Sequence, residues 1–486
     1  MTTKPAPSAF LANVLQNALA RDAQLPFWRL ARLALFQVSC GMVAVMLTGT
    51  LNRVMIVEFG MPGWVVALMV ALPLVAAPFR ALIGYKSDTH RSVFGWRRLP
   101  YVWFGSLLQF GGLAIMPFAL LVLSGDGVGP AWPGFIGAAL GFLMIGAGMH
   151  TVQTAGLALA TDLATEDNRA RVVAFHYVML LIGMMLSGLV FSTLLIDFTP
   201  LTLIQVIQGA AVLAFALNIY AMWGQETRSR PGQATPVDDD AEGFRLAWRA
   251  FLTGGSTRRL LVGSALGAAG FNMADVVIEP YGGQVLGLSV GATTLLTAIW
   301  AMGTLIGFLL AWRALARGGE ALRVAGAGVV IGLPAFALVM LSAPLHSANL
   351  YGLGAFLIGA GGGMFGVGTL SAVMALAREG YSGLAIGAWG AVQATAAGVA
   401  IAFAGVARDM IAHAAAHGGF GAVVYATADA HATGYLSIYA IEILLLFATL
   451  IVIGPLAKFR LDPTTAGAFA LPELSPSSPA YGKARP

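Results

Sequence analysis

The chain is dominated by long apolar runs that are almost free of charge. Its 486 residues are 58% hydrophobic and only 10% charged, whereas a soluble domain has about 25% charged residues. A helix needs about 20 apolar residues to cross a bilayer, and these runs reach that length. They are too long for the strands of about ten residues that build a membrane barrel. The sequence therefore predicts an all-α membrane protein.

Twelve such runs predict twelve transmembrane helices, in two sets of six. The expected helices cover 31–57, 63–83, 99–123, 132–161, 171–196 and 199–223, then 260–281, 290–313, 321–343, 350–377, 381–407 and 434–457. The expected domains are a tail with an interfacial helix at 1–30, a first half at 31–223, a linker at 224–258, a second half at 259–457 and a tail at 458–486.

The positive charges predict how the chain crosses the membrane. All Lys and Arg except Arg53 and Arg408 fall in the two tails or in the loops between even and odd helices, counting Arg80 at one helix end. Because cytoplasmic loops carry the excess of Lys and Arg, we expect both tails to be cytoplasmic and the chain to lie in an inner membrane. The net charge of +5 is then a topology signal that meets lipid, and we expect no nucleic-acid partner.

The two halves repeat each other weakly. Segments 54–60 and 276–282 both contain an apolar run, a Glu, an aromatic residue and a Gly, and the triplet Gly-Ala-Gly occurs at 146–148 and at 359–361. Parallel six-helix halves are the arrangement of the major facilitator superfamily. We therefore expect a major facilitator superfamily-like fold with two pseudo-symmetric halves.

The loop after the second helix carries Gly84 and Asp88 and then the pair Arg97 and Arg98. It resembles the major facilitator loop signature of a Gly, three residues, an Asp and a basic pair. Asp88 can cap a helix end, and the arginines can pair with it and with lipid phosphate. The resemblance implies a conformational and structural role. The corresponding loop of the second half, 313–323, does not match.

Three charged residues on helices 1 and 7 are candidates for function, because ionisable side chains inside a membrane are costly. Asp275 and Glu279 lie four residues apart on one helix face. Helices 1 and 7 are pseudo-equivalent and should face each other, so we predict that Arg53 pairs with Asp275 or Glu279. The pair is either an outer gate or proton-coupling site, or a static contact between the halves. Glu442, alone in the last helix, does not add a cluster.

Two histidines lie at similar depth in adjacent helices. Neutral imidazole is a good axial ligand for a metal in a macrocycle when its second ring nitrogen is held by a neighbour. His150 and His176 could act in this way, with Gln153 as the neighbour of His150. The alternative is that both are hydrogen-bonded packing residues. The sequence contains no recognisable nucleotide loop, catalytic triad or zinc pattern, so we expect no enzyme.

Several longer strings resemble one family. They are 49–58, 77–84, 87–92, 95–98 and 279–283, and they look like the PucC/LhaA family, also called the bacteriochlorophyll delivery family, over about residues 30–457. The strings look closer to its LhaA branch. The resemblance implies an assembly factor for a light-harvesting antenna, here the light-harvesting 1 core complex, which binds or delivers bacteriochlorophyll a to antenna polypeptides. Pigment-synthesis enzymes such as chlorophyll synthase are further expected partners.

A pigment carrier should offer an apolar groove, close-packed glycines, aromatic walls and one or two Mg ligands. Helices 4, 5, 10 and 11 supply His150, His176, Gln153, Phe365 and Trp389, which we take as the expected pigment site. Bacteriochlorophyll Mg at either histidine is the one metal we expect. Two alternatives stay open: a proton-coupled secondary transporter of a tetrapyrrole or another small solute, with a polar central cavity, and a structural partner that shields antenna helices.

Overall fold

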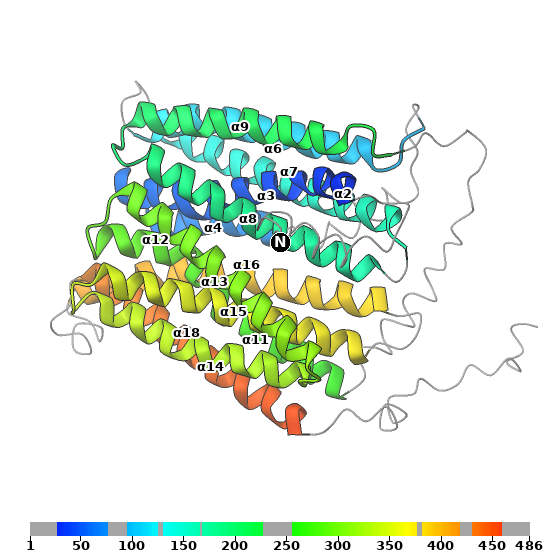
Figure 1. Ribbon diagram of the computed structural model, residues 1–486. Helices are drawn as coiled ribbons and strands as arrows, with labels where there is room; N and C mark the ends of the chain where they lie inside the picture. Colours follow the sequence, from blue (N-terminus) through cyan, green and yellow to red (C-terminus); the bar gives the residue numbers. More distant parts are fainter. Residues whose placement is uncertain are drawn as a thin grey trace, which may run out of the picture.

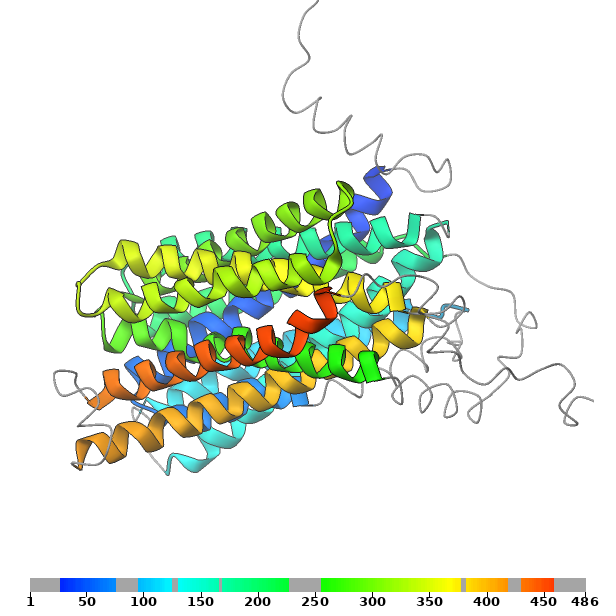
Figure 2. The same ribbon diagram turned by 90° about the horizontal axis from the view of Figure 1, so that it is seen from below.

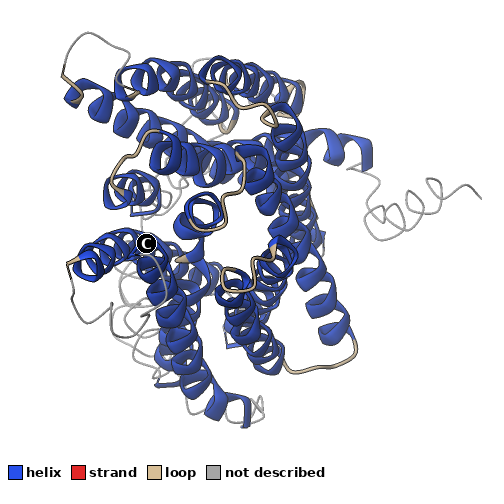
Figure 3. Ribbon diagram, turned by 90° about the vertical axis from the view of Figure 1, so that its left-hand side faces the viewer, coloured by secondary structure: helices blue, strands red, loops and turns tan. Residues whose placement is uncertain are grey.

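The protein is a bundle of long helices in the computed structural model. The structure describes residues 27–75, 95–124, 130–165, 168–226, 255–376, 382–417 and 430–458. Within these ranges no strand occurs (Figure 3). Eleven of the described helices are long and apolar enough to cross a membrane, and a twelfth apolar helix, Gly63–Leu74, ends next to the undescribed residues 76–94. The predicted all-α membrane fold is confirmed.

Each half forms one side of the bundle, the first half above and the second half below in Figure 1, and Figure 2 looks onto the second half from below. The first half contains α2 (Phe27–Leu33), α3 (Leu35–Ala44), the π-helices η1 (Val45–Leu51) and η2 (Val54–Glu58), α4 (Gly63–Val75), α6 (Leu99–Leu123), α7 (Trp132–Leu163), α8 (Arg169–Leu194) and α9 (Pro200–Met222). The second half contains α11 (Gly255–Asn272), α12 (Ala274–Gln284), α13 (Val290–Ala316), α14 (Ala321–Ser342), α15 (Ala348–Leu376), α16 (Ser382–Ala416) and α18 (Ala430–Lys458).

The start of α2 and the end of α18 lie toward the same end of the bundle, on the right in Figure 1. We call this the terminal end and the opposite one the distal end. The halves approach closely in their distal parts. A Cβ at Gly188 of α8 would lie 2.9 Å from the Cβ of Ala298 on α13, and one at Gly291 would lie 2.5 Å from the Ser192 carbonyl oxygen. Small residues therefore set the contact between the halves, as is usual in membranes.

The first and seventh spans are both irregular where they meet. The first changes from α-helix to π-helix at Val45, and the seventh is interrupted at Met273 between α11 and α12. At that interruption the Asn272 side chain donates to the Ala268 carbonyl at 2.7 Å. Side chains that bond the backbone of the preceding turn bend helices. π-Helical turns are frequent at functional sites, so the meeting point of the first and seventh spans is a candidate site.

Among the described helices, two ends differ from the prediction by more than about four residues. α11 begins at Gly255, earlier than expected, and α16 continues to Ala416 instead of ending at 407. In α16 the charges that end the apolar run, Arg408 and Asp409, pair with each other, so the helix can continue past them. Of the predicted interfacial helix in 1–30, the part before Phe27 lies outside the described residues, and 27–30 form the start of α2. The linker residues 227–254, the tail after Lys458, and Gly84 and Asp88 also lie outside the described residues.

Candidate functional site

A cavity of about 160 Å³ lies between the two halves. Its walls come from the first span and α8 on one side and from α12 and α13 on the other. They consist of Ala44, Thr48, Met184, Ala274, Asp275, Ile278, Glu279, Leu296, Thr297 and Trp300. Two carboxyl groups therefore face a small and otherwise mostly apolar space at the centre of the protein.

Glu279 is held at the cavity wall by its neighbours. One carboxyl oxygen accepts a hydrogen bond from the Thr297 hydroxyl, and the other has no hydrogen-bond partner among the described residues. The side chain is 1% exposed. Gly49 in η1 makes room for it, because a Cβ there would lie 2.5 Å from the carboxyl oxygen Oε1.

The first span supplies a hydrogen-bond donor for a backbone carbonyl of the seventh span. Pro280 has no N–H, so the carbonyl of Val276, four residues earlier, loses its usual helical partner. The Asn52 side chain donates to that carbonyl at 3.1 Å. Asn52 is fully buried, so the contact satisfies a backbone group that water does not reach.

Glu442 is a third acid near the site, and sequence reasoning set it aside. It lies on α18, is fully buried, and is close enough to Asp275 to interact electrostatically. Its carboxyl also faces the backbone of Ala274, the first residue after the break in the seventh span. The sequence signal that could have identified Glu442 is an acid in an otherwise apolar helix. No second charged residue lies at helical spacing from it, so the sequence suggested no partner.

Arg53 does not make the predicted ion pair. Its guanidinium pairs with Glu58, and it also donates to the Leu288 carbonyl at 3.0 Å. In the described chain neither Asp275 nor Glu279 is ion-paired with Arg53. The physical reason is the π-helix, whose turns bring residues five apart onto one face and so place Glu58 beside Arg53. Arg53 still joins the halves, through a carbonyl group of the second half.

A second contact at the distal end joins the halves through α16. Asp409 accepts a hydrogen bond from the backbone N–H of Trp64, at the start of α4, at 2.8 Å. Arg408 pairs with Asp409 and donates to the Tyr435 hydroxyl at 2.6 Å. Both arginines that depart from the positive-charge pattern therefore take part in contacts that connect the halves.

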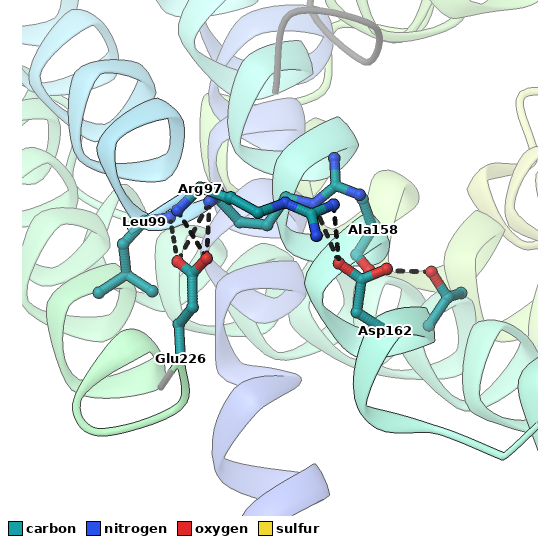
Figure 4. Close-up of polar contacts among 7 residues, drawn as sticks. Arg97, Leu99, Ala158, Asp162 and Glu226 are labelled. Carbon is teal, nitrogen blue, oxygen red and sulfur yellow. Dashed lines mark hydrogen bonds and ion pairs between the residues drawn. The ribbon is translucent and has the colours of Figure 1, made fainter. Parts of the chain in front are cut away.

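The basic pair after the second helix organises the terminal end of the first half (Figure 4). The Glu226 carboxylate accepts hydrogen bonds from the backbone N–H groups of Arg97, Arg98 and Leu99, at 2.7 to 3.1 Å. The Arg98 side chain pairs with Asp162 at 3.2 Å. A carboxylate at a helix N-terminus satisfies its open donors, so Glu226 and Asp162 tie the starts and ends of three helices together.

The predicted pigment ligands lie in packed surroundings. His176 is fully buried, and its Nδ1 lies 2.8 Å from the Val172 carbonyl. Its ring packs 5.3 Å from that of Phe36, and its Nε2 has no hydrogen-bond partner in the part of the chain that the structure describes. His150 is 7% exposed. Neither histidine lines the central cavity.

The other predicted pigment residues pack in different places. The Gln153 amide donates to Gln37 at 3.5 Å. Phe365 fills the core of the second half, 5.7 Å from the ring of Phe271. Trp389 donates from its indole nitrogen to Thr369 at 3.1 Å. The structure therefore distributes the five expected pigment residues over both halves, because close packing between helices places the aromatic side chains in separate cores.

An apolar groove of about 340 Å³ lies along α8 and α9. Its walls are Met42, Val190, Phe191, Leu194, Thr202, Gln205, Val206, Gly209, Ala210 and Leu213. Val190, Leu194 and Leu213 are each about half exposed, so the groove opens on the outside of the bundle. Gln205 is exposed and has no hydrogen bond among the described residues. Sequence reasoning missed this groove.

The fold is shared with known transporters. A bacterial homologue of the lysosomal transporter Spinster, in an inward-facing conformation, matches with a TM-score of 0.62 and 16% identity, over 91% of this chain and 95% of that one. The nucleoside transporter NupG matches with a TM-score of 0.65 and 15% identity, over 87% and 99%. At this identity the likeness shows the major facilitator fold.

Sequence comparison identifies the family. The family model described as "PUCC protein" matches residues 50–461. Protein PucC of Rhodovulum sulfidophilum is 54% identical over 82% of this chain and 88% of its own. A protein of Rhodobacter capsulatus from the puhA-bchM intergenic region is 50% identical over 91% and 92%. A more distant relative there, 28% identical over 77% and 86%, is named bacteriochlorophyll synthase 44.5 kDa chain. The chain is a multi-pass membrane protein that belongs to the PucC family.

Proposed function

We propose that this protein is a non-enzymatic assembly factor for a bacterial light-harvesting antenna. It binds bacteriochlorophyll and delivers it to antenna polypeptides within the inner membrane, with both tails in the cytoplasm. Family membership supports the link to antenna and bacteriochlorophyll genes. The resemblance to the LhaA branch favours the light-harvesting 1 core complex as the target, with pigment-synthesis enzymes such as chlorophyll synthase as donors of the cargo.

The groove on α8 and α9 is the observation that carries this proposal. Its volume of about 340 Å³ falls within the range of about 300–1,000 Å³ that is typical of ligand sites. It is apolar and open on the outside of the bundle, where a membrane-dissolved pigment can enter sideways. Gln205 lies roughly 8 Å from the start of α9 at Pro200, by the helical rise per residue. Its amide oxygen is a ligand type that suits Mg²⁺.

The two histidines remain a second set of proposed ligands. His176 keeps Nε2 free of hydrogen bonds within the described chain, as an axial ligand requires. However, its ring packs against Phe36, so a macrocycle could bind there only after the helices around it separate. Pigment at His150 or His176, with Gln153, Phe365 and Trp389 nearby, therefore requires a more open conformation than the groove does.

The absorption spectrum of the purified protein tests both sites. The tagged chain is purified in mild detergent from a purple bacterium that makes bacteriochlorophyll, and the near-infrared band is measured per mole of protein. We expect Gln205→Leu to lower pigment occupancy about tenfold, as the loss of about 1.4 kcal/mol of binding energy would. Gln208→Leu is the control, because Gln208 faces the Ala114 carbonyl and not the groove.

The outcomes separate the sites. Loss of the band in the double variant His150→Leu, His176→Leu, with Gln205→Leu unchanged, would assign the pigment to the histidines. A well-folded wild-type protein without pigment would contradict pigment carriage and favour a partner that only shields antenna helices.

A proton-coupled secondary transporter is the second candidate. Asp275 and Glu279 in the central cavity favour it, as expected for intramembrane acids. Against it, a cavity of about 160 Å³ is smaller than the usual range of about 300–1,000 Å³ for ligand sites, and a tetrapyrrole would not fit without separation of the halves. Substrate-driven proton flux in proteoliposomes, abolished by Asp275→Asn, would support this function.

A further inference from the structure

Three carboxyl groups meet at the centre of the bundle. Asp275 and Glu279 line the cavity from α12, and Glu442 approaches Asp275 from α18. Both carboxyl oxygens of Glu442, and one of Glu279, are buried without a hydrogen-bond partner in the described chain. The break in the seventh span at Met273 lies beside Asp275. Two acids of α12 therefore lie near a third acid from α18.

No cation forms an ion pair with these groups within the described residues. None of the three carboxyls forms an ion pair there with Lys, Arg or His. Arg53 is near enough to Glu279 to interact electrostatically, but its guanidinium is paired with Glu58. The other ionisable groups near the acids are the phenols of Tyr351, close to Glu279, and Tyr439, close to Glu442. The ring of Tyr281 packs against both of them, and the ring of Tyr435 packs against Tyr281. Arg408 and Asp409 lie beyond Tyr435 and pair with each other.

Glu58 is a glutamate of the first half that has a cationic partner. It occupies the position of the first half that corresponds to Glu279, in the repeated pattern of an apolar run, a Glu and an aromatic residue. Glu58 pairs with Arg53, and its side chain is 33% exposed. Glu279 is 1% exposed and bonds only a hydroxyl group. The repeat therefore keeps the acid in both halves but provides a cation for only one.

Ionised carboxylates cannot be buried together in this way without a large penalty. An isolated charge in a low-dielectric interior is strongly disfavoured, and in practice the group neutralises. Like charges that share a site raise the penalty further. We propose that Asp275, Glu279 and Glu442 form a proton-binding site, loaded in this conformation. When the halves part and water enters the cavity, the carboxyl O–H bonds ionise and the protons pass to water.

Asp275 is the exchange point of the site. It is the one of the three whose side chain is partly accessible, through the cavity, whereas Glu442 is closed off behind it. Thr48 and Thr297 add hydroxyl groups to the cavity wall, and these can hold the water that receives a proton. This site goes beyond antenna assembly, since it links the state of the bundle to proton concentration whatever the cargo is.

Infrared spectroscopy of the full chain in lipid nanodiscs tests the proposal. The protein comes from a host that makes no bacteriochlorophyll, so the outcome is independent of pigment binding. At neutral pH we expect a carbonyl stretch of protonated carboxylic acids that moves to lower frequency in D₂O. Asp275→Asn, Glu279→Gln and Glu442→Gln should each remove one part of it. Glu58→Gln is the control and should remove none, because the Glu58 carboxyl is paired with the Arg53 guanidinium.

The wild-type spectrum keeps the test decisive if a variant does not fold. A wild-type protein without this band at neutral pH, or a band unchanged in all three variants, would overturn the proposal. So would a wild-type melting temperature that falls when sodium is replaced by choline, with no such fall in Asp275→Asn, because a metal cation would then occupy the site in place of protons.

Discussion

The Asn52 side chain donates to the Val276 carbonyl, which Pro280 deprives of its helical partner. This contact crosses the boundary between the two halves. On either side of it, Gly49 makes room for Glu279, and the Arg53 guanidinium lies against Gly283. The two strings at 49–58 and 279–283, which are far apart in the sequence, therefore meet in space. Their residues form one contact surface between the halves.

Replacing Asn52 should destabilise the protein, and the size of the loss should depend on whether residue 280 is proline. Asn52→Leu leaves a buried carbonyl unsatisfied and should lower the free energy of unfolding by about 1–3 kcal/mol. In a Pro280→Ala background, the introduced alanine restores the missing N–H, so the same change should cost about 1 kcal/mol less. Unfolding of all four variants in mixed micelles by added sodium dodecyl sulfate measures the coupling. Equal costs in both backgrounds would show that Asn52 acts by packing alone.

Gly49 should not tolerate a side chain. A methyl group there would lie 2.5 Å from the Glu279 carboxyl and 3.0 Å from the Thr297 hydroxyl. Gly49→Ala should therefore lower the free energy of unfolding by about 1–3 kcal/mol, as overpacking does. Gly326→Ala on α14 is the matched control, because no atom lies within 4 Å of its added methyl, and it should be neutral. A Gly49→Ala protein as stable as wild type would mean that Glu279 has room to move.

Much of the fold could be predicted because hydropathy alone determines where a helix crosses a membrane. The predicted helix 99–123 matches α6, and 199–223 differs from α9 by one residue at each end. Prediction was less accurate where charges pair inside a helix. Arg408 and Asp409 look like the end of an apolar run, yet their mutual pairing lets α16 continue to Ala416.

The site was predictable only in part. Asp275 and Glu279 stand out as acids in a membrane helix, and they do face one cavity. Arg53 was expected to pair with an acid of the facing seventh span, but it pairs with Glu58 of its own span, which π-helical turns bring onto the same face. The approach of Glu442 to Asp275 depends on how α18 packs against a broken helix, and neither residue lies near the other in sequence. The pigment site remains a prediction.

Glu226 should hold the terminal end of α6 in place. Its carboxylate accepts from three backbone N–H groups, those of Arg97, Arg98 and Leu99. Glu226→Ala should cost about 1 kcal/mol of stability, as the loss of a helix cap does. Amide hydrogen exchange of the first turn of α6 should rise with it. Asp197→Ala, an exposed acid, is the control. Unchanged exchange in Glu226→Ala would show that water replaces the carboxylate without penalty.

Asp409 should keep the distal end closed. It accepts from the Trp64 N–H in the other half and pairs with Arg408. Asp409→Ala removes both contacts. Hydrogen bonds to charged groups contribute about 1.5–3 kcal/mol. Their loss should lower the ratio of the closed to the open conformation roughly tenfold or more. The expected result is a longer and broader distance distribution between the halves.

Electron spin resonance between labels at Leu68 of α4 and Met410 of α16 measures that distance. Both side chains are exposed, and the labels are placed in a Cys40→Ala background because Cys40 is the one native cysteine. Glu320→Ala is the control: Glu320 pairs with Arg323 on its own helix and should leave the distribution unchanged. A distribution that Asp409→Ala also leaves unchanged would show that helix packing around Gly63 and Gly405 closes the distal end without the carboxylate.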